Sequence, residues 1–155
     1  PYSTLFRSRG LSPIRPEPDG LMTALRELAA QTTELFRVRC HFHCRVPVLI
    51  EDVTFAGHLY RIAQEAVNNA LKHASPRTIG IRLNRDRDHI ALVVTDDGKG
   101  IGTVSPRRQG LGLHIMQYRA SLVRGTMTVQ PHKNGGTEVI CSAPYGYDKT
   151  SKRKN

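Results

Sequence analysis

The sequence predicts an α/β fold, a two-layer sandwich in which helices cover one face of a mixed sheet. Long stretches carry apolar residues three and four positions apart, which is typical of amphipathic helices, and shorter stretches alternate apolar and polar residues, as half-buried strands do. The strands also follow one another in pairs. A doubly wound sheet would need strict alternation of strands and helices, so that fold is excluded.

The expected elements run in the order helix, strand, helix, strand, strand, helix, strand, strand. Pro13, Pro16 and Pro18 suit an extended connector over residues 1–18, and Asp19-Gly20 then offers a helix start. A Ser-Pro dipeptide should end the longest helix. The expected ranges are helix 20–36, a strand over 36–50, helix 54–74, strands 79–83 and 90–95, helix 111–123, and strands 126–130 and 138–142.

The composition is typical of one globular domain, which we expect over residues 19–145, ahead of a basic tail at 146–155. No apolar run is long enough to cross a bilayer, and no signal peptide is visible. The formal charge of +10 suggests a polyanion as partner. Aromatic residues make up only 6% of the chain and form no basic–aromatic array, so we expect no nucleic-acid partner.

Three cysteines are too few for a disulfide framework and favour a reducing compartment, the cytoplasm. The run Cys40-His41-Phe42-His43-Cys44 has the composition of a metal site. In a strand, however, its cysteines would face one side and its histidines the other, which argues against a tetrahedral zinc site.

Two patches of polar residues stand out, one on the long helix and one directly after the strand over 90–95. Glu65, Asn69 and Lys72 stand at i, i+4 and i+7, so a carboxylate, an amide oxygen and an ammonium share one line. That line could hold hydrated Mg²⁺ and phosphates, or could be a solvated helix face. In Asp96-Asp97-Gly98-Lys99-Gly100-Ile101-Gly102, a carboxylate at a strand end could accept a hydrogen bond from an amine such as that of adenine, or the segment could be an ordinary turn.

A third patch, Gly110-Leu111-Gly112-Leu113, opens the helix over 111–123, with Arg107 and Arg108 just upstream. Free amides at a helix start bind anions, and the arginines could reach phosphate oxygens. The pattern is neither the full dinucleotide fingerprint nor a Walker phosphate loop, so alone it identifies no nucleotide.

Taken in order, Glu-x3-Asn on a helix, Asp-x-Gly-x-Gly after a strand, Gly-x-Gly-Leu before a helix and Gly-Gly-Thr before a strand resemble the GHKL ATPases. This superfamily contains gyrase, heat-shock chaperone ATPases, histidine kinases and the mismatch-repair ATPase. Residues 59–74 look like the N box of the kinase branch, in the manner of nitrate-sensor-like kinases. The resemblance implies the Bergerat ATP-binding fold, ATP and Mg²⁺ as cofactors, and the catalytic domain of a two-component sensor histidine kinase.

The resemblance also implies roles for single residues. Asn69 would coordinate Mg²⁺, and Glu65 would lie beside the metal and the attacking group. Asp96 would bind the adenine amine, supported by Thr137. Residues 102–110 would form a lid. The other residues that the resemblance places around the nucleotide are Lys72, His73, Gly98, Gly100, Ile101, Arg107, Arg108, Gly110, Leu111, Gly112 and Leu113.

In such kinases an acidic residue follows the phosphoacceptor histidine, and none of the seven histidines here has one after it. The resemblance therefore implies transfer to a histidine supplied in trans, on the dimerisation hairpin of a longer kinase. That kinase would be a homodimer, membrane-anchored or not, and would act on a cognate response regulator. The alternative is a non-catalytic nucleotide-binding regulatory module, a degenerate kinase or an anti-sigma-like factor.

Overall fold

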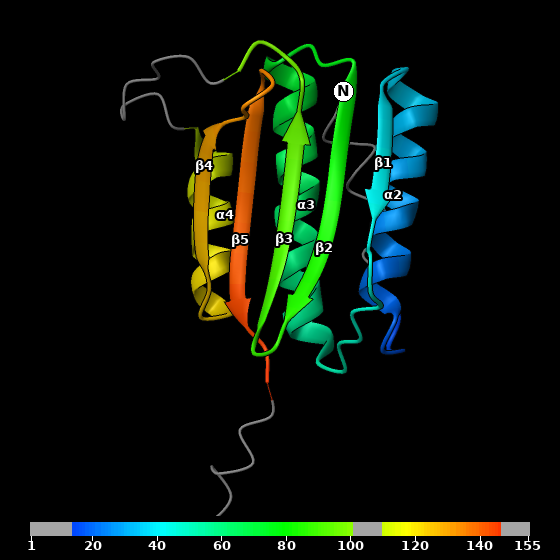
Figure 1. Ribbon diagram of the computed structural model, residues 1–155, viewed down its shortest axis with the longest axis vertical. Coiled ribbons are helices and arrows are strands. Elements are labelled where there is room, and N and C mark those ends of the chain that lie inside the picture. Colours follow the sequence, from blue (N-terminus) through cyan, green and yellow to red (C-terminus); the bar gives the residue numbers. More distant parts are fainter. Residues whose placement is uncertain (1–13, 101–109, 147–155) are drawn as a thin grey trace, which may run out of the picture.

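The computed structural model describes residues 14–100 and 110–146, in which three helices lie behind a five-stranded sheet (Figure 1). The elements are α2 (Gly20–Phe36), β1 (Arg39–His43), α3 (Val53–His73), β2 (Thr78–Asp86), β3 (His89–Asp96), α4 (Leu111–Leu122), β4 (Thr126–Pro131) and β5 (Thr137–Pro144). Their order and type are those expected from the sequence. None of the helices in the described ranges is long and apolar enough to span a membrane.

The sheet is mixed, as predicted. Its strand order is β1-β2-β3-β5-β4, with β1 parallel to β2 and every other neighbouring pair antiparallel. The chain thus reaches β4 before it inserts β5 between β3 and β4. Helix α3 lies behind the centre of the sheet, with α2 behind the β1 edge and α4 behind β4 and β5 (Figure 1).

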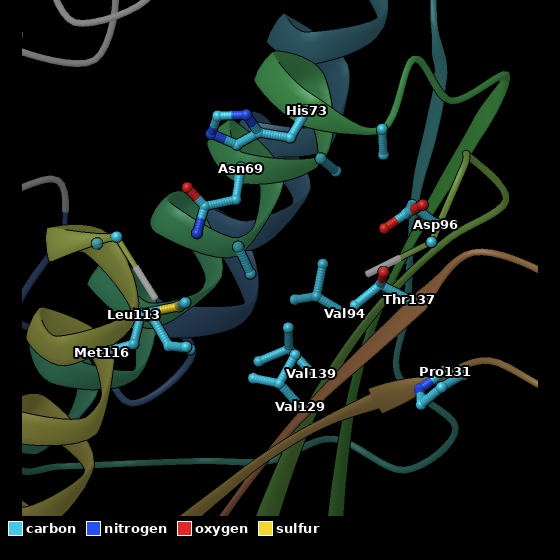
Figure 2. A pocket seen from close by; sticks show the side chains of 16 residues that line it. Asn69, His73, Val94, Asp96, Leu113, Met116, Val129, Pro131, Thr137 and Val139 are labelled. Atoms are coloured by element: carbon cyan, nitrogen blue, oxygen red, sulfur yellow. The ribbon is translucent and has the colours of Figure 1, made fainter. Parts of the chain in front are cut away.

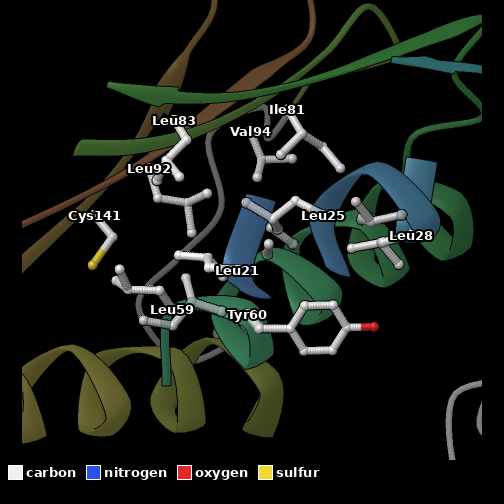
Figure 3. Packing of buried hydrophobic residues seen from close by; sticks show 14 of the residues in the cluster. Leu21, Leu25, Leu28, Leu59, Tyr60, Ile81, Leu83, Leu92, Val94 and Cys141 are labelled. Atoms are coloured by element: carbon white, nitrogen blue, oxygen red, sulfur yellow. The ribbon is translucent and has the colours of Figure 1, made fainter. Parts of the chain in front are cut away.

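The alternation of apolar and polar residues along the strands explains why helices cover only one face of the sheet. Ile79, Ile81 and Leu83 of β2 are fully buried, whereas Arg82 and the polar residues after Leu83 are exposed. Register pairs Ile81 with Val94 and Leu83 with Leu92, so these side chains share one face. They pack against leucines of α2 and α3 (Figure 3), and their burial is the main stabilising term of the fold.

Helix α3 has a polar start that the sequence analysis missed. The Asp52 carboxylate accepts a 3.0 Å hydrogen bond from the amide of Phe55, which makes Asp52 the N-cap and places the helix start at Val53. At α2, Asp19 does precede the first helical residue, but its side chain makes no capping bond.

The expected strand over 36–50 is wrong for most of its length, because only Arg39–His43 pairs with a neighbour. After Cys44 the chain turns into the core, where Val48 and Ile50 are buried. The amide of Ile50 donates to the carbonyl of Pro18. These apolar residues are therefore covered by the α2 side of the domain without joining the sheet.

Tyr145 ties together three segments at the end of the sheet where β5 stops. Its hydroxyl accepts a 3.0 Å hydrogen bond from the amide of Glu51, and its amide donates to the Asp88 carbonyl at 2.7 Å. Its ring packs on Phe55, with centroids 5.0 Å apart, and carries the Arg85 guanidinium 5.4 Å from its centroid. One residue thus joins the end of β2 and the β2–β3 turn to the start of α3.

Replacing Tyr145 should reveal these contacts separately. Tyr145→Phe removes one solvent-accessible hydrogen bond and should cost about 0.5–1 kcal/mol of unfolding free energy. Tyr145→Ala also removes the ring contacts and should cost about 2 kcal/mol. Urea denaturation measures both. Tyr118→Ala is the matched control, because the Tyr118 side chain is 64% exposed; equal losses at positions 118 and 145 would contradict the prediction.

Candidate functional site

A cavity of about 720 Å³ opens between the helices and one end of the sheet. Figure 2 shows Asn69 and His73 of α3 on one side, Leu113 and Met116 of α4 on another, and Asp96 beside Thr137 at the far end. Strands β3, β4 and β5 provide the floor. The lining residues are Ala66, Asn69, Ala70, His73, Ala74, Val94, Asp96, Gly100, Gly110, Gly112, Leu113, Met116, Val129, Pro131, Thr137 and Val139.

Asp96 is the buried carboxylate of this cavity. It ends β3 on the core face of the sheet, and only 8% of its surface is exposed. Its Oδ1 accepts a 2.8 Å hydrogen bond from the amide of Gly98. Burial raises the pKa of Asp96, and the backbone hydrogen bonds from Gly98 and Thr137 oppose part of that rise. The site therefore offers one desolvated acceptor to a ligand that donates hydrogen bonds.

The loop after Asp96 is held on two neighbouring elements. Asp97 Oδ1 accepts from the amides of Arg77 at 2.8 Å and Thr78 at 2.9 Å, and the amide of Lys99 donates to the Ala74 carbonyl at 2.9 Å. A Cβ on Gly98 would collide with that same carbonyl. Gly98 is thus required for close packing on the end of α3 and does not itself line the cavity.

The β4–β5 turn contributes a residue that the sequence analysis did not assign to the site. Gly136 has φ +86°, and a Cβ built on it would collide with the Asp96 carbonyl oxygen. The turn therefore packs directly on the strand end that carries the carboxylate. The Gly-Gly-Thr motif was visible in the sequence, but the close approach of Gly136 to Asp96 depends on the register of β5 against β3.

The opposite part of the cavity is formed by the start of α4. Gly110 is the N-cap and supplies no side-chain hydrogen bond, so the first amides of α4 have no side-chain cap. Gly110, Gly112 and Leu113 line the cavity. Exposed amides and the positive end of the helix dipole favour an anion at this position.

The structure brings together eight of the residues predicted from the sequence and leaves others aside. Glu65 lies in contact with Gly112 at the edge of the cavity, whereas Lys72 and Leu111 are exposed and outside its lining. Ile101, Arg107, Arg108 and the proposed lid lie outside the described residues. The predicted residues that line the cavity are Asn69, His73, Asp96, Gly100, Gly110, Gly112, Leu113 and Thr137.

The side chains of the Cys-His run do not converge on one point. Along β1, Cys40 and Phe42 turn inward and His41 and His43 are exposed, as alternation predicted. Burial raises the pKa of the Cys40 thiol to about 12, which disfavours the thiolate that a metal needs. Across residues 14–100 and 110–146, no group of three or more His, Cys, Asp or Glu side chains could hold an ion.

Comparisons with family models and with curated proteins point to the same family. The model of the "Histidine kinase-, DNA gyrase B-, and HSP90-like ATPase" family matches residues 55–146. The signal transduction histidine-protein kinase/phosphatase DegS of Bacillus subtilis is 32% identical over 140 residues, covering 85% of this chain and 36% of DegS. The nitrate/nitrite sensor protein NarQ of Escherichia coli is 35% identical over 124 residues, covering 79% of this chain and 22% of NarQ. The chain thus spans well under half of each relative.

Solved structures share the fold. The histidine kinase domain of a blue-light activated histidine kinase from Erythrobacter litoralis superposes with a TM-score of 0.64 at 21% identity, over 84% of this chain and 64% of that one. The ATP binding domain of PrrB from Mycobacterium tuberculosis gives 0.63 at 18% identity, over 84% of this chain and 96% of that one. At these identities the likeness concerns the fold alone.

The two neighbouring aspartates should affect stability in opposite directions as pH changes. The pKa of Asp96 is raised by burial, so its ionisation opposes folding, and the cost appears as pH rises from the ordinary aspartate pKa through the raised folded value. The pKa of Asp97 is lowered by hydrogen bonds from Thr78 and Arg77, so its contribution is present above the ordinary value and lost as pH falls through the lowered one.

In melts between about pH 3 and pH 8, Asp97→Asn should lower the melting temperature near neutrality, and the deficit should shrink as pH falls toward 3. Asp96→Asn should raise the melting temperature of the nucleotide-free protein near neutrality, and the gain should vanish in acid. A shift of both variants in the same direction at neutral pH would contradict these assignments.

Proposed function

Because the chain belongs to the family of histidine kinase-, DNA gyrase B- and HSP90-like ATPases, we propose that it is the ATP-binding catalytic domain of a sensor histidine kinase. The observation that carries the proposal is the placement of Asp96, a buried carboxylate at one end of a cavity whose floor is apolar. An ionised carboxylate accepts a hydrogen bond from the exocyclic amine of adenine, whereas guanine presents a carbonyl oxygen at the corresponding position.

In this proposal the adenine ring lies over Val94, Val139 and Gly100, with Asp96 and Thr137 at its polar edge. The phosphates extend toward Asn69, His73 and the first amides of α4. Lys72, Arg107 and Arg108 are proposed as cations for the phosphates and Ile101 as part of the base pocket. We propose that the domain ends at residue 145, a boundary supported by a family match that ends at residue 146.

The residues present fit Mg²⁺ as part of the nucleotide complex. Asn69 places an amide group on the cavity wall, and Glu65 lies one turn earlier on α3. Mg²⁺ takes few protein ligands and completes its shell with water and phosphate oxygens. When bound it would neutralise phosphate charge, and Asn69 is the residue proposed to hold it.

The proposed reaction is transfer of the γ-phosphoryl group to a histidine on a separate hairpin. The lone pair of a neutral imidazole nitrogen forms a bond to phosphorus, and the bond from phosphorus to the bridging oxygen breaks with its electrons leaving on ADP. The proton on the other ring nitrogen is then lost to solvent. The chain's contribution is positioning and charge neutralisation.

An exposed apolar stripe on α4 supports docking of such a hairpin. Leu111, Ile115, Tyr118 and Leu122 are spaced by four, three and four residues, and Leu111 and Tyr118 are 75% and 64% exposed. This spacing is the pattern by which one helix packs on another. The stripe starts beside Gly110 and Gly112, so a hairpin seated on it would lie close to the γ-phosphate.

The wider setting follows from the proposed function. The hairpin would pair two kinase chains into a homodimer, and the phosphorylated histidine would serve a cognate response regulator. The three free thiols suit the cytoplasm, where ATP is available. The second candidate, a regulatory module without turnover, would bind ATP equally well and would transfer no phosphoryl group to any added hairpin.

Asp96→Asn should weaken ATP binding about 10- to 100-fold, because a charge-assisted hydrogen bond is replaced by an amide that can turn a donor toward the adenine amine. Isothermal titration with ATP–Mg²⁺ measures the change. The matched control is Asp97→Asn, which removes the adjacent charge while leaving the cavity lining intact. Unchanged affinity in Asp96→Asn, or an equal loss in both variants, would overturn the assignment.

Tyr118→Lys should reduce phosphotransfer to the separately added hairpin by about tenfold, because an aromatic side chain at a helix interface is replaced by a charge. ATP affinity should stay the same. Leu49→Lys, which places a lysine at an exposed apolar residue outside the stripe, should leave both quantities unchanged. Equal transfer rates for the two variants would exclude α4 as the docking surface.

A further inference from the structure

The start of α4 lacks the polar groups that usually accompany a helix N-terminus. Gly110 provides no side-chain cap, and no acidic residue lies in the first turn. The partial positive charge of the first amides is therefore uncompensated from within the helix. It has to be met by solvent, by a ligand or by a group from another element.

Glu65 of α3 approaches the start of α4. A Cβ built on Gly112 would collide with Glu65 Oε1 and lie 3.0 Å from Cδ, so the carboxylate fills the space that a side chain at residue 112 would occupy. Gly112 itself lines the cavity. An acid from α3 thus lies against the first turn of α4. Figure 2 shows that α4, at Leu113 and Met116, borders the part of the cavity away from Asp96.

We propose that, in the nucleotide-free protein, the Glu65 carboxylate occupies the position at the start of α4 that the phosphates take when a nucleotide binds. This inference rests on the proposed ATP site. The carboxylate stabilises the uncapped helix end until a nucleotide arrives, and it repels phosphates that approach the same helix end. A divalent cation bound with the nucleotide compensates this repulsion, so Glu65 makes binding depend on the metal.

This role is separate from any part in the transfer step, because it concerns binding equilibria alone. It explains why residue 112 is a glycine in physical terms: any side chain there would displace Glu65 from the helix end. It also gives Glu65 a function in a domain whose nucleophile comes from elsewhere. Glu65 is here a positioning residue that sets the difference in binding affinity between metal-free and metal-bound nucleotide.

The closing experiment measures the ATP dissociation constant in excess EDTA and in excess Mg²⁺ for the wild type, Glu65→Gln and Glu34→Gln. Glu34 is exposed on α2 and provides the same change of net charge away from the cavity. Glu65→Gln should bind metal-free ATP about 3- to 10-fold more tightly than the wild type, and its gain in affinity from Mg²⁺ should shrink by the same factor. Glu34→Gln should match the wild type.

The outcomes separate the two proposals. ATP binding with an unchanged Mg²⁺ gain in Glu65→Gln, or an equal change in Glu34→Gln, overturns the role of Glu65 and leaves the proposed function standing. No binding of ATP to the wild type under either condition overturns the proposed function and this inference together.

A double-mutant cycle tests the contact without nucleotide. In the Glu65→Ala background, Gly112→Ala should raise the melting temperature slightly, because alanine favours helix over glycine. In the wild-type background the same change displaces Glu65 and should lower it. Equal shifts in both backgrounds would show that Gly112 and Glu65 are not coupled and would overturn the proposal.

Discussion

The carboxylate of Asp96 must stay hydrogen-bonded while it is almost completely removed from water, and the surrounding backbone is built to satisfy that requirement. The amide of Gly98 reaches back to Oδ1, which is possible only because the loop turns sharply against the end of α3. Gly136 lets the β4–β5 turn pack against the main-chain carbonyl of Asp96. Two glycines from distant parts of the chain therefore contact the same residue, one at its carboxylate and one at its backbone.

The cavity exists because small residues stand where a closely packed interior would have large ones. Ala66 and Ala70 of α3 and its C-cap Ala74 recur at four-residue spacing on the cavity side, and Gly112 of α4 lines the same space. Protein interiors normally fill such space to crystal-like density. The same helix buries Leu59 and Ile62 in its first half, and Leu59 shares a face with Ala66, seven residues later. The first half of that face of α3 therefore packs into the core, and its last turns leave room for a ligand.

Much of the fold could be predicted from the sequence because periodicity reports which side of an element is buried. The prediction failed at residues 44–50, where apolar side chains enter the core from irregular backbone. In the site, Asp96 and Asn69 could be found from motifs. Lys72 was grouped with Asn69 on helical spacing, yet His73 is the residue that faces the cavity, since it continues the line of Ala66, Asn69 and Ala70. Val129 and Pro131 could not be found, because their place depends on strand register.

The position of β5 has a consequence for how the protein folds during synthesis. Because β5 lies between β3 and β4, a nascent chain that has emerged only as far as residue 136 has an unpaired edge on β3 and a β4 strand with no neighbour. The sheet can close only when residues 137–144 become available, which makes the last step a long-range one. Until then both edges are open to pairing with other chains, so the interval before β5 emerges is the period of greatest risk of aggregation.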